Sequence, residues 1–235
     1  AAWMDDCGID RAYVRELKDA FTAQGYITSD LDGNQITSFH PGAMAYDAIG
    51  HLPADTGAKL GVVAPDGAQP MWRASEYCAD HCLPFLWDPG QFMTSLDSEE
   101  MARFVDAATW IAVNRYESEL LCRGTGRTIA ELSRDVEALI VTHGADGSSV
   151  WQRGASLEVP AVSGVTALDP TGGGDAYRAG LVLGLLRDAD WRDSARLASV
   201  LGALAVESHG TQNHRPDRDI MIRRFETTYE SPWIW

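Results

Sequence analysis

Positive charge is scarce in this chain of 235 residues. Lysine and arginine together number 19, against 34 aspartates and glutamates, so the formal net charge is −15. Nucleic acids and anionic membranes bind basic surfaces, which displace their counterions. We therefore expect no nucleic-acid partner and no membrane partner. Any nucleotide ligand would have to be held by local backbone amides and a metal ion.

Lysine is especially rare, and several catalytic signatures are missing. Lys18 and Lys59 are the only lysines, and neither follows a glycine, which excludes the Gly-Lys-Ser/Thr of a P-loop. The loops of a protein kinase are absent as well. No His-Glu-x-x-His and no Gly-x-Ser-x-Gly stretch occurs, which excludes the common zinc-protease and serine-hydrolase signatures.

Long apolar runs are missing too. No uninterrupted run approaches the roughly 20 residues that span a bilayer, and the first residues lack the basic-then-apolar pattern of a secretory signal. A cytoplasmic location is the resulting expectation. The 45% share of hydrophobic residues is normal for a globular protein and suffices for one sizeable core.

Cysteine is sparse and shows no disulfide framework. Cys7, Cys78, Cys82 and Cys122 have irregular spacing, which predicts reduced thiols. Cys78 and Cys82 fall on adjacent turns of a predicted helix together with His81, so a metal site can be considered there. A closed zinc site needs four ligands, however, and no fourth lies nearby in the sequence. Buried thiols are the favoured interpretation.

What the chain does contain is an alternation of strand-like apolar runs with helical segments. This alternation predicts an α/β fold, with a mostly parallel sheet covered by helices on both faces. We expect one domain over residues 1–235. The predicted buried strands are 60–64, 84–87, 109–113 and 139–142.

Turn-rich segments add two β-hairpins to this plan. Strands at 26–29 and 35–39 flank the turn 30–34, and a second hairpin lies near 149–153 and 156–160. Two apolar helices follow, one from Asp175 to 186 and one from 191 to 208, which ends before Gly210. We expect both helices to pack in the core.

A glycine-rich segment stands at the start of the first of these helices. Gly172, Gly173 and Gly174 let successive amides turn toward one point, and the helix terminus adds about half a positive charge there. Phosphate would fit this cradle. Asp175 would repel a resting phosphate, so its carboxylate is better explained as a base for a hydroxyl that attacks the phosphate. The alternative is an ordinary turn with Asp175 as the helix cap.

At this point the chain resembles the ribokinase, or PfkB, family of carbohydrate and nucleoside kinases. Residues 169–175 resemble its D-T-x-G-A-G-D signature, with Pro170 and Gly173 as departures. Three further matches stand in the family's order, and the resemblance runs from about Gly25 to the last helix. These matches are 114–117 to N-x-x-E, 142–147 to the T-x-G-x-x-G nucleotide loop, and 210–212 to the turn that closes the adenine pocket.

The resemblance implies a ribokinase-like fold with a small β lid, to which residues 25–40 contribute. It makes Asp175 the general base toward the γ-phosphate of ATP, with the three cradle glycines supplying amides. Glu117 would organise Mg²⁺ through water, and its alternative is an exposed helix face. Nucleotide contacts would come from Asn114, Thr142, Gly144, Gly147 and Gly210. A monovalent cation such as K⁺ would be held by Asp169, Thr171, Ala205, Ser208, Gly210 and His214.

The lid sequence 27–44 looks most like that of the adenosine-kinase-like branch. Phe39 and Met44 would suit a purine face, although a core role fits them equally. The expected reaction is therefore ATP-dependent phosphorylation of a nucleoside, adenosine above others, at its 5′-hydroxyl. A sugar acceptor is the alternative within the family, and a non-catalytic nucleotide-binding protein is a third. The lid would also be the surface for a homodimer.

One departure from the family concerns the acceptor site. Family members begin with strands that carry a substrate-binding Asp and a Gly-Gly-Asn-x-x-Asn stretch, and neither occurs in this sequence. Either these strands precede the present numbering, or half of the acceptor site is lost. We favour the first, because a sheet that lacks its edge strands would be costly and exposed.

Overall fold

The computed structural model describes residues 2–29, 35–46 and 56–234. Its centre is a six-stranded sheet in which the strand order follows the chain. The first four strands are parallel, and the last two add an antiparallel hairpin. The four predicted strands and the second hairpin are thus confirmed, but the prediction that all four are buried is wrong for the edge strand, where Val62 is exposed. The strands are β3 (Gly61–Val63), β4 (Phe85–Trp87), β5 (Trp110–Asn114), β6 (Ala138–Thr142), β7 (Ser148–Gln152) and β8 (Ala155–Val159).

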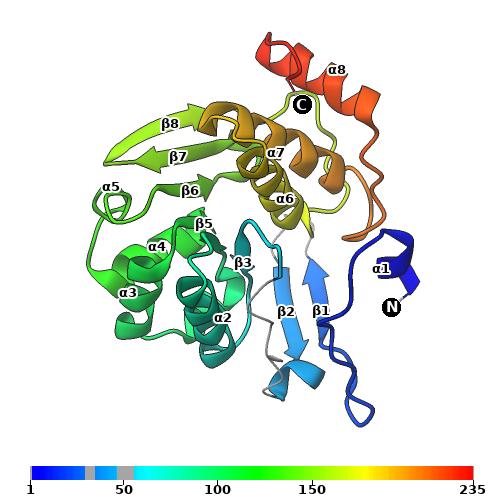
Figure 1. Ribbon diagram of the computed structural model, residues 1–235. Coiled ribbons are helices and arrows are strands. Elements are labelled where there is room, and N and C mark those ends of the chain that lie inside the picture. The colour runs from blue at the N-terminus through cyan, green and yellow to red at the C-terminus, as the bar shows by residue number, and fades with distance from the viewer. Residues whose placement is uncertain (1, 30–34, 47–55, 235) are drawn as a thin grey trace.

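Helices fill the connections and the C-terminal part of the chain (Figure 1). Three short 3₁₀ turns lie among them, η1 (Gly42–Ala45), η2 (Gly90–Ser95) and η3 (Gly144–Asp146). The α-helices are α1 (Ala2–Asp6), α2 (Ala68–Asp80), α3 (Ser98–Ala107), α4 (Arg115–Thr125), α5 (Ile129–Leu132), α6 (Gly173–Leu186), α7 (Trp191–Val206) and α8 (Arg218–Tyr229).

The sheet separates two hydrophobic cores. Successive side chains of a strand point to opposite faces, so neighbouring residues of β4 and β5 enter different cores. Trp87 and Ile111 pack with α2 to α5, whereas Leu86 and Ala112 pack with α6 to α8. Helices therefore cover both faces, as the alternation of elements predicted (Figure 1).

The predicted lid hairpin is present as a separate two-stranded sheet. β1 (Gln24–Ser29) pairs with β2 (Gln35–His40) in antiparallel register, and the turn 30–34 lies outside the described residues. The ring of Phe39 meets Phe92 of η2 edge-on, with 6.0 Å between centroids. Met44 lies in η1, directly after the hairpin. The hairpin thus touches the large sheet's loops at its Phe39 end.

Two glycines bring α6 and α7 into close contact. A Cβ atom on Gly180 would lie 2.4 Å from Cα of Ala198, and one on Gly184 would lie 2.3 Å from Oγ of Ser194. Only glycine permits this approach of the two backbones. The two predicted C-terminal helices are confirmed, with α6 beginning at Gly173 and α7 ending at Val206.

The thiols differ in their surroundings. Cys78 is buried and Cys122 is partly buried, but Cys7 and Cys82 are exposed, so the expectation of buried thiols is wrong for these two. No group of three or more His, Cys, Asp or Glu side chains within the described ranges could hold a metal ion. No helix in the same ranges is long and apolar enough to cross a membrane.

Candidate active site

Polar residues gather where three neighbouring strands end. Asp88 follows β4, Asn114 is the last residue of β5, and Thr142 is the last residue of β6. Asn114 and Thr142 are direct partners in the parallel register. Because the carboxyl ends of parallel strands meet at one edge of a sheet, these three residues share the edge at which α/β proteins bind ligands.

The glycine cradle forms the start of α6. Gly172 is the N-cap, with a φ of +85° that favours glycine. The amide of Gly173 donates to the carbonyl of Pro170, and the amide of Ala176 donates to the carbonyl of Gly172. The amides of Gly174 and Asp175 have no hydrogen-bond acceptor in the part of the chain that the structure describes. Two free amides at a helix N-terminus make a place for an anion.

Asp175 is the third residue of α6, so the alternative that it caps the helix is wrong. Gly172 is the cap, and no side chain in the described ranges bonds to the free amides there. The Asp175 side chain is exposed, and it forms no hydrogen bond or ion pair with any described residue. A carboxylate without a partner, next to an anion site, is free to accept a proton from a ligand.

The cradle rests on the end of α7 and on the loop that follows. A Cβ atom on Gly173 would lie 2.6 Å from Cγ1 of Val206. The Asp169 carboxylate accepts the amide of Gly210 at 2.9 Å through one oxygen and the amide of Thr171 at 2.9 Å through the other. These two hydrogen bonds hold the pKa of Asp169 below its usual value.

Three of the six predicted cation-site residues are thereby joined to one another. Asp169 bonds directly to Thr171 and Gly210. Ala205 is buried in the last turn of α7, and its carbonyl accepts the amide of Ser208 at 3.1 Å. The Nδ1 atom of His214 is buried and has no hydrogen-bond partner among the described residues.

Asn114 and Glu117 form a reciprocal cap at the start of α4. The Asn114 side chain accepts the amide of Glu117 at 2.8 Å, and the Glu117 carboxylate accepts the amide of Asn114 at 2.8 Å. This is a capping box, so part of the N-x-x-E pattern is explained by helix geometry. Glu117 is only 5% exposed, and the alternative of an exposed helix face is therefore wrong.

A buried cluster of charges that none of the sequence motifs predicted lies beside the cradle. The Nε atom of Arg178 lies 2.5 Å from Oδ2 of Asp88, and its Nη2 atom lies 3.8 Å from Oε2 of Glu117. Burial raises the pKa of Asp88 to about 6; Arg178 opposes the shift, while the charges of Glu117 and Asp175 add to it. Four charged groups thus share one site.

Two signals in the sequence point to this cluster. Asp88 follows a predicted buried strand directly, as Asn114 does, which places it at the ligand-binding edge of the sheet. Arg178 stands three residues after Asp175, so both lie on one face of the same helix. Their meeting with Glu117 depends on three separate segments of the chain and is visible only in the structure.

The predicted nucleotide loop is a tight turn between β6 and β7. Gly144 and Gly147 have φ values of +60° and +97°. A Cβ atom on Gly147 would clash with the carbonyl oxygen of Val159. The amide of His143 donates to the carbonyl of Gly147 at 2.8 Å and closes the turn.

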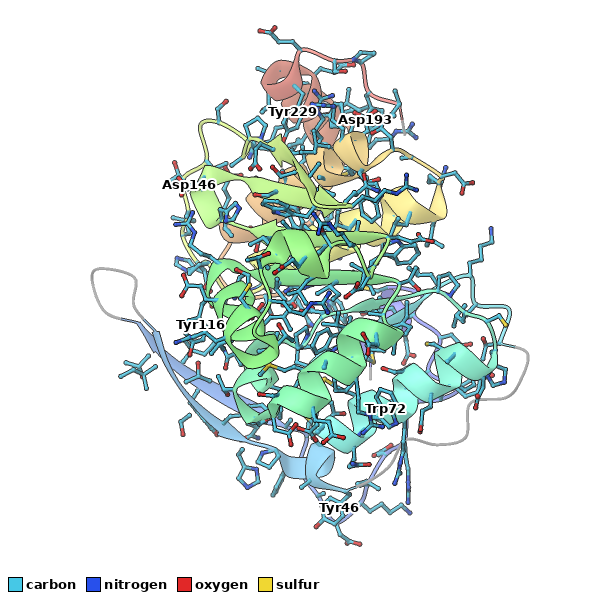
Figure 2. The ribbon with its side chains drawn as sticks, turned by 90° about the vertical axis from the view of Figure 1, so that its left-hand side faces the viewer. Tyr46, Trp72, Tyr116, Asp146, Asp193 and Tyr229 are labelled. Atoms are coloured by element: carbon cyan, nitrogen blue, oxygen red, sulfur yellow. The ribbon has the colours of Figure 1, made fainter. Side chains whose placement is uncertain are left out.

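Side chains fix this loop at both of its ends. The Nε2 atom of His143 lies 2.7 Å from Oγ of Ser149, which donates to Glu158. Arg115 donates to Asp146 at 3.1 Å and so ties the loop to the start of α4. Asp146 and Tyr116, the residue after Arg115 in α4, both lie on the left-hand side of Figure 2.

Comparison with known proteins supplies the family. Residues 1–218 match the pfkB family carbohydrate kinase. The structure is similar to that of a nucleoside kinase from Burkholderia thailandensis solved with inosine. The TM-score is 0.93 and the sequence identity 42%, over 98% of this chain and 78% of that one. A nucleoside kinase from Methanothermobacter thermautotrophicus is 29% identical over 234 residues, which are 97% of this chain and 75% of that protein.

A third comparison extends the likeness in fold. The nucleoside kinase of Methanocaldococcus jannaschii, an archaeal member of the ribokinase family, has a TM-score of 0.88 at 23% identity, over 96% of this chain and 75% of that one. The α/β architecture, with its mostly parallel sheet, is therefore ribokinase-like. The chain belongs to the pfkB family of carbohydrate kinases and is a phosphotransferase that acts on an alcohol group.

Proposed function

We propose that this chain transfers the γ-phosphoryl group of ATP to the 5′-hydroxyl of a purine nucleoside, with Asp175 as the general base. The observation that carries the proposal is the carboxylate of Asp175, which has no partner among the residues that the structure describes, beside two amides at the start of α6 that are likewise without an acceptor there. The similarity to a nucleoside kinase solved with inosine supports a nucleoside as the acceptor. A second structure of that kinase, solved with ADP-inosine, supports ATP as the donor.

The reaction follows from these groups. Asp175 takes the proton of the attacking hydroxyl as its oxygen bonds to the γ-phosphorus, and the bond between that phosphorus and the β-phosphate oxygen breaks, which releases ADP. The amides of Gly174 and Asp175 donate to the phosphoryl oxygens as charge spreads over them. Gly144 and Gly147 shape the loop for the nucleotide, and Thr142 and Asn114 line the neighbouring strand ends.

The acceptor is tested by offering a panel of alcohols. The full-length protein is supplied with ATP, Mg²⁺ and one of five acceptors, which are adenosine, inosine, cytidine, ribose and fructose. ADP release is measured, and the phosphorylated hydroxyl is identified by phosphorus NMR. We expect a kcat/KM for a purine nucleoside at least about a hundredfold above that for either sugar, since a polar site rejects acceptors that leave its groups unpaired. A preference for ribose or fructose would make the chain a sugar kinase. ATP binding without transfer to any acceptor would make it a binding protein.

The carboxylates at the sheet edge fit a magnesium ion. Oδ1 of Asp88 is buried and has no hydrogen-bond partner among the described residues, and Glu117 uses only one oxygen in its capping box. Mg²⁺ prefers such oxygens, and it keeps several waters, so one or two carboxylates suffice beside the phosphates. When bound, the ion neutralises charge on the transferring phosphate. Glu117 would hold it through water, with Asp88 beside it.

Glu117→Gln is expected to raise the Mg²⁺ concentration for half-maximal rate about tenfold, because one charged anchor of the hydrated ion is lost. Glutamine can still accept the amide of Asn114, so the helix start is kept. Glu131→Gln is the matched control, since Glu131 forms the same capping box with Thr128 at an exposed site. An unchanged Mg²⁺ requirement in Glu117→Gln would remove this residue from the metal site.

A monovalent cation is also part of the proposal. Asp169, Thr171 and Gly210 are already joined by hydrogen bonds, so a K⁺ ion there would tighten the support of the cradle. We expect turnover to be several-fold faster in potassium chloride than in tetramethylammonium chloride of equal ionic strength. Equal rates in the two salts would argue against the cation site.

The lid offers a surface for a homodimer. Four apolar side chains of the hairpin are exposed, Tyr26, Ile27, Ile36 and Phe39. Successive strand residues point to opposite faces, so the register places Tyr26 and Ile36 together on one face, and Ile36 is 79% exposed there. Exposed apolar side chains on one face are typical of an interface. Ile36→Asp is expected to shift the sedimentation of the protein from dimer to monomer, whereas Tyr13→Asp, outside the lid, leaves it unchanged. A wild-type monomer would contradict the proposal.

A further inference from the structure

We propose that Arg178 is a positioning residue for phosphoryl transfer. Its guanidinium group holds the carboxylates of Asp88 and Glu117 in place beside the cradle and ties them to the helix that carries Asp175. The inference rests on the proposed function, because it concerns the same site. It goes beyond that function in assigning a role to a side chain that need not touch either substrate.

The first support is the position of the guanidinium group. Its Nε atom lies 2.5 Å from Oδ2 of Asp88 and its Nη2 atom lies 3.8 Å from Oε2 of Glu117. The three side chains are 13%, 6% and 7% exposed, in the order Arg178, Asp88 and Glu117. One cation thus lies beside two buried carboxylates from separate segments, Asp88 directly after β4 and Glu117 in the first turn of α4.

The second support is electrostatic. Two buried carboxylates and the nearby Asp175 would repel one another if no cation lay among them. Removing one partner of a buried ion pair leaves an uncompensated charge, which is strongly unfavourable. Arg178 is therefore the group that allows Asp88 and Glu117 to stay together. Its charge is spread over a planar group and can lie near both carboxylates at once, whereas a lysine places its charge at one point.

The third support links Arg178 to the transfer site. It stands on the same helix face as Asp175, one turn further along. Its Nη2 atom also donates to the carbonyl of Ala112 in β5, at 3.5 Å. A Cβ atom on Gly174 would lie 2.8 Å from Nη1, so the guanidinium group reaches the floor of the cradle. Arg178 thus joins α6 to the sheet edge at the point where base, carboxylates and amides meet.

The test compares Arg178→Met, Arg178→Lys and the double variant Arg178→Met/Asp88→Asn with the wild type. Arg196→Met is the matched control, since Arg196 pairs with Asp193 at the start of α7, away from the site. Three quantities are measured on the full chain. These are the thermal unfolding of the ligand-free protein, the calorimetric affinity for a non-hydrolysable ATP analogue with and without Mg²⁺, and kcat and KM.

We expect Arg178→Met to lower kcat about a hundredfold with nucleoside KM changed only a few-fold, because misplaced groups slow the transfer itself. The gain in analogue affinity that Mg²⁺ provides should fall about tenfold, since supporting residues orient those that hold the ion. Compared with Arg178→Met, Arg178→Lys should recover much of the lost unfolding temperature but little of the lost kcat. Adding Asp88→Asn to Arg178→Met should also raise the unfolding temperature, because one uncompensated charge is gone.

Two results would overturn the inference. Full recovery of kcat in Arg178→Lys would show that any cation suffices and that the guanidinium group has no positioning role. An unchanged effect of Mg²⁺ on analogue affinity in Arg178→Met or Arg178→Lys would reduce Arg178 to a structural ion pair. If Arg178→Met does not fold, Arg178→Lys and the double variant still test whether Arg178 is a positioning residue. Failure of the proposed function is a separate outcome, because the acceptor panel tests it by measuring phosphoryl transfer by the wild-type protein alone.

Discussion

Replacing Asp175 with asparagine is expected to lower kcat by at least about a hundredfold, while ATP affinity stays within a few-fold, because the loss falls on the transition state. Asparagine has the same shape but cannot take the proton of the attacking hydroxyl. The Asp175 side chain is exposed and has no partner among the described residues, so the substitution breaks no contact of the fold. Steady-state kinetics and calorimetric titration of ATP measure the two quantities.

Asp193→Asn is the matched control for this substitution. Asp193 is the third residue of α7, as Asp175 is of α6, so both changes remove a negative charge from the first turn of a helix. The control should retain full turnover. Turnover within a few-fold of wild type in Asp175→Asn would mean that Asp175 is not the base, and the mechanism would have to be abandoned.

Replacing Gly180 with leucine is expected to destabilise the protein by about 3 kcal/mol, because overpacking at this site forces α6 away from α7. A Cβ atom there would already lie 2.4 Å from Cα of Ala198, which is backbone and cannot turn aside. For a chain of this size the loss corresponds to a melting temperature lower by about 6 to 12 °C. Activity should fall as well, since α6 carries Asp175 and the end of α7 supports Gly173.

Ala179→Leu controls for the added side chain. Ala179 neighbours Gly180 on α6 but is exposed, so a leucine there meets solvent. We expect its melting temperature, measured by calorimetry, to stay close to that of the wild type. If Gly180→Leu also melted at the wild-type temperature, the close contact between the two helices would not be what stabilises this part of the fold.

Several features of this protein followed from short stretches of its sequence. Each buried strand is a continuous apolar run, and each lid or sheet hairpin has its turn residues between its strands, so local pattern alone locates them. The segment 169–175 likewise places glycines and Asp175 within one turn of helix. Family and fold could be predicted, and Asp175 could be proposed as the base, because each depends on residues that are neighbours in the chain.

The tertiary structure decided how these pieces act on one another. The N-x-x-E pattern does not say that Glu117 is buried, and nothing local says that Arg178 lies between Asp88 and Glu117. Those contacts join segments separated by about thirty to ninety residues, and they exist only because parallel strands end at one edge and α6 packs across it. The sequence by itself determined which chemical groups are available, and the packing of α6 on the sheet decided which of them meet.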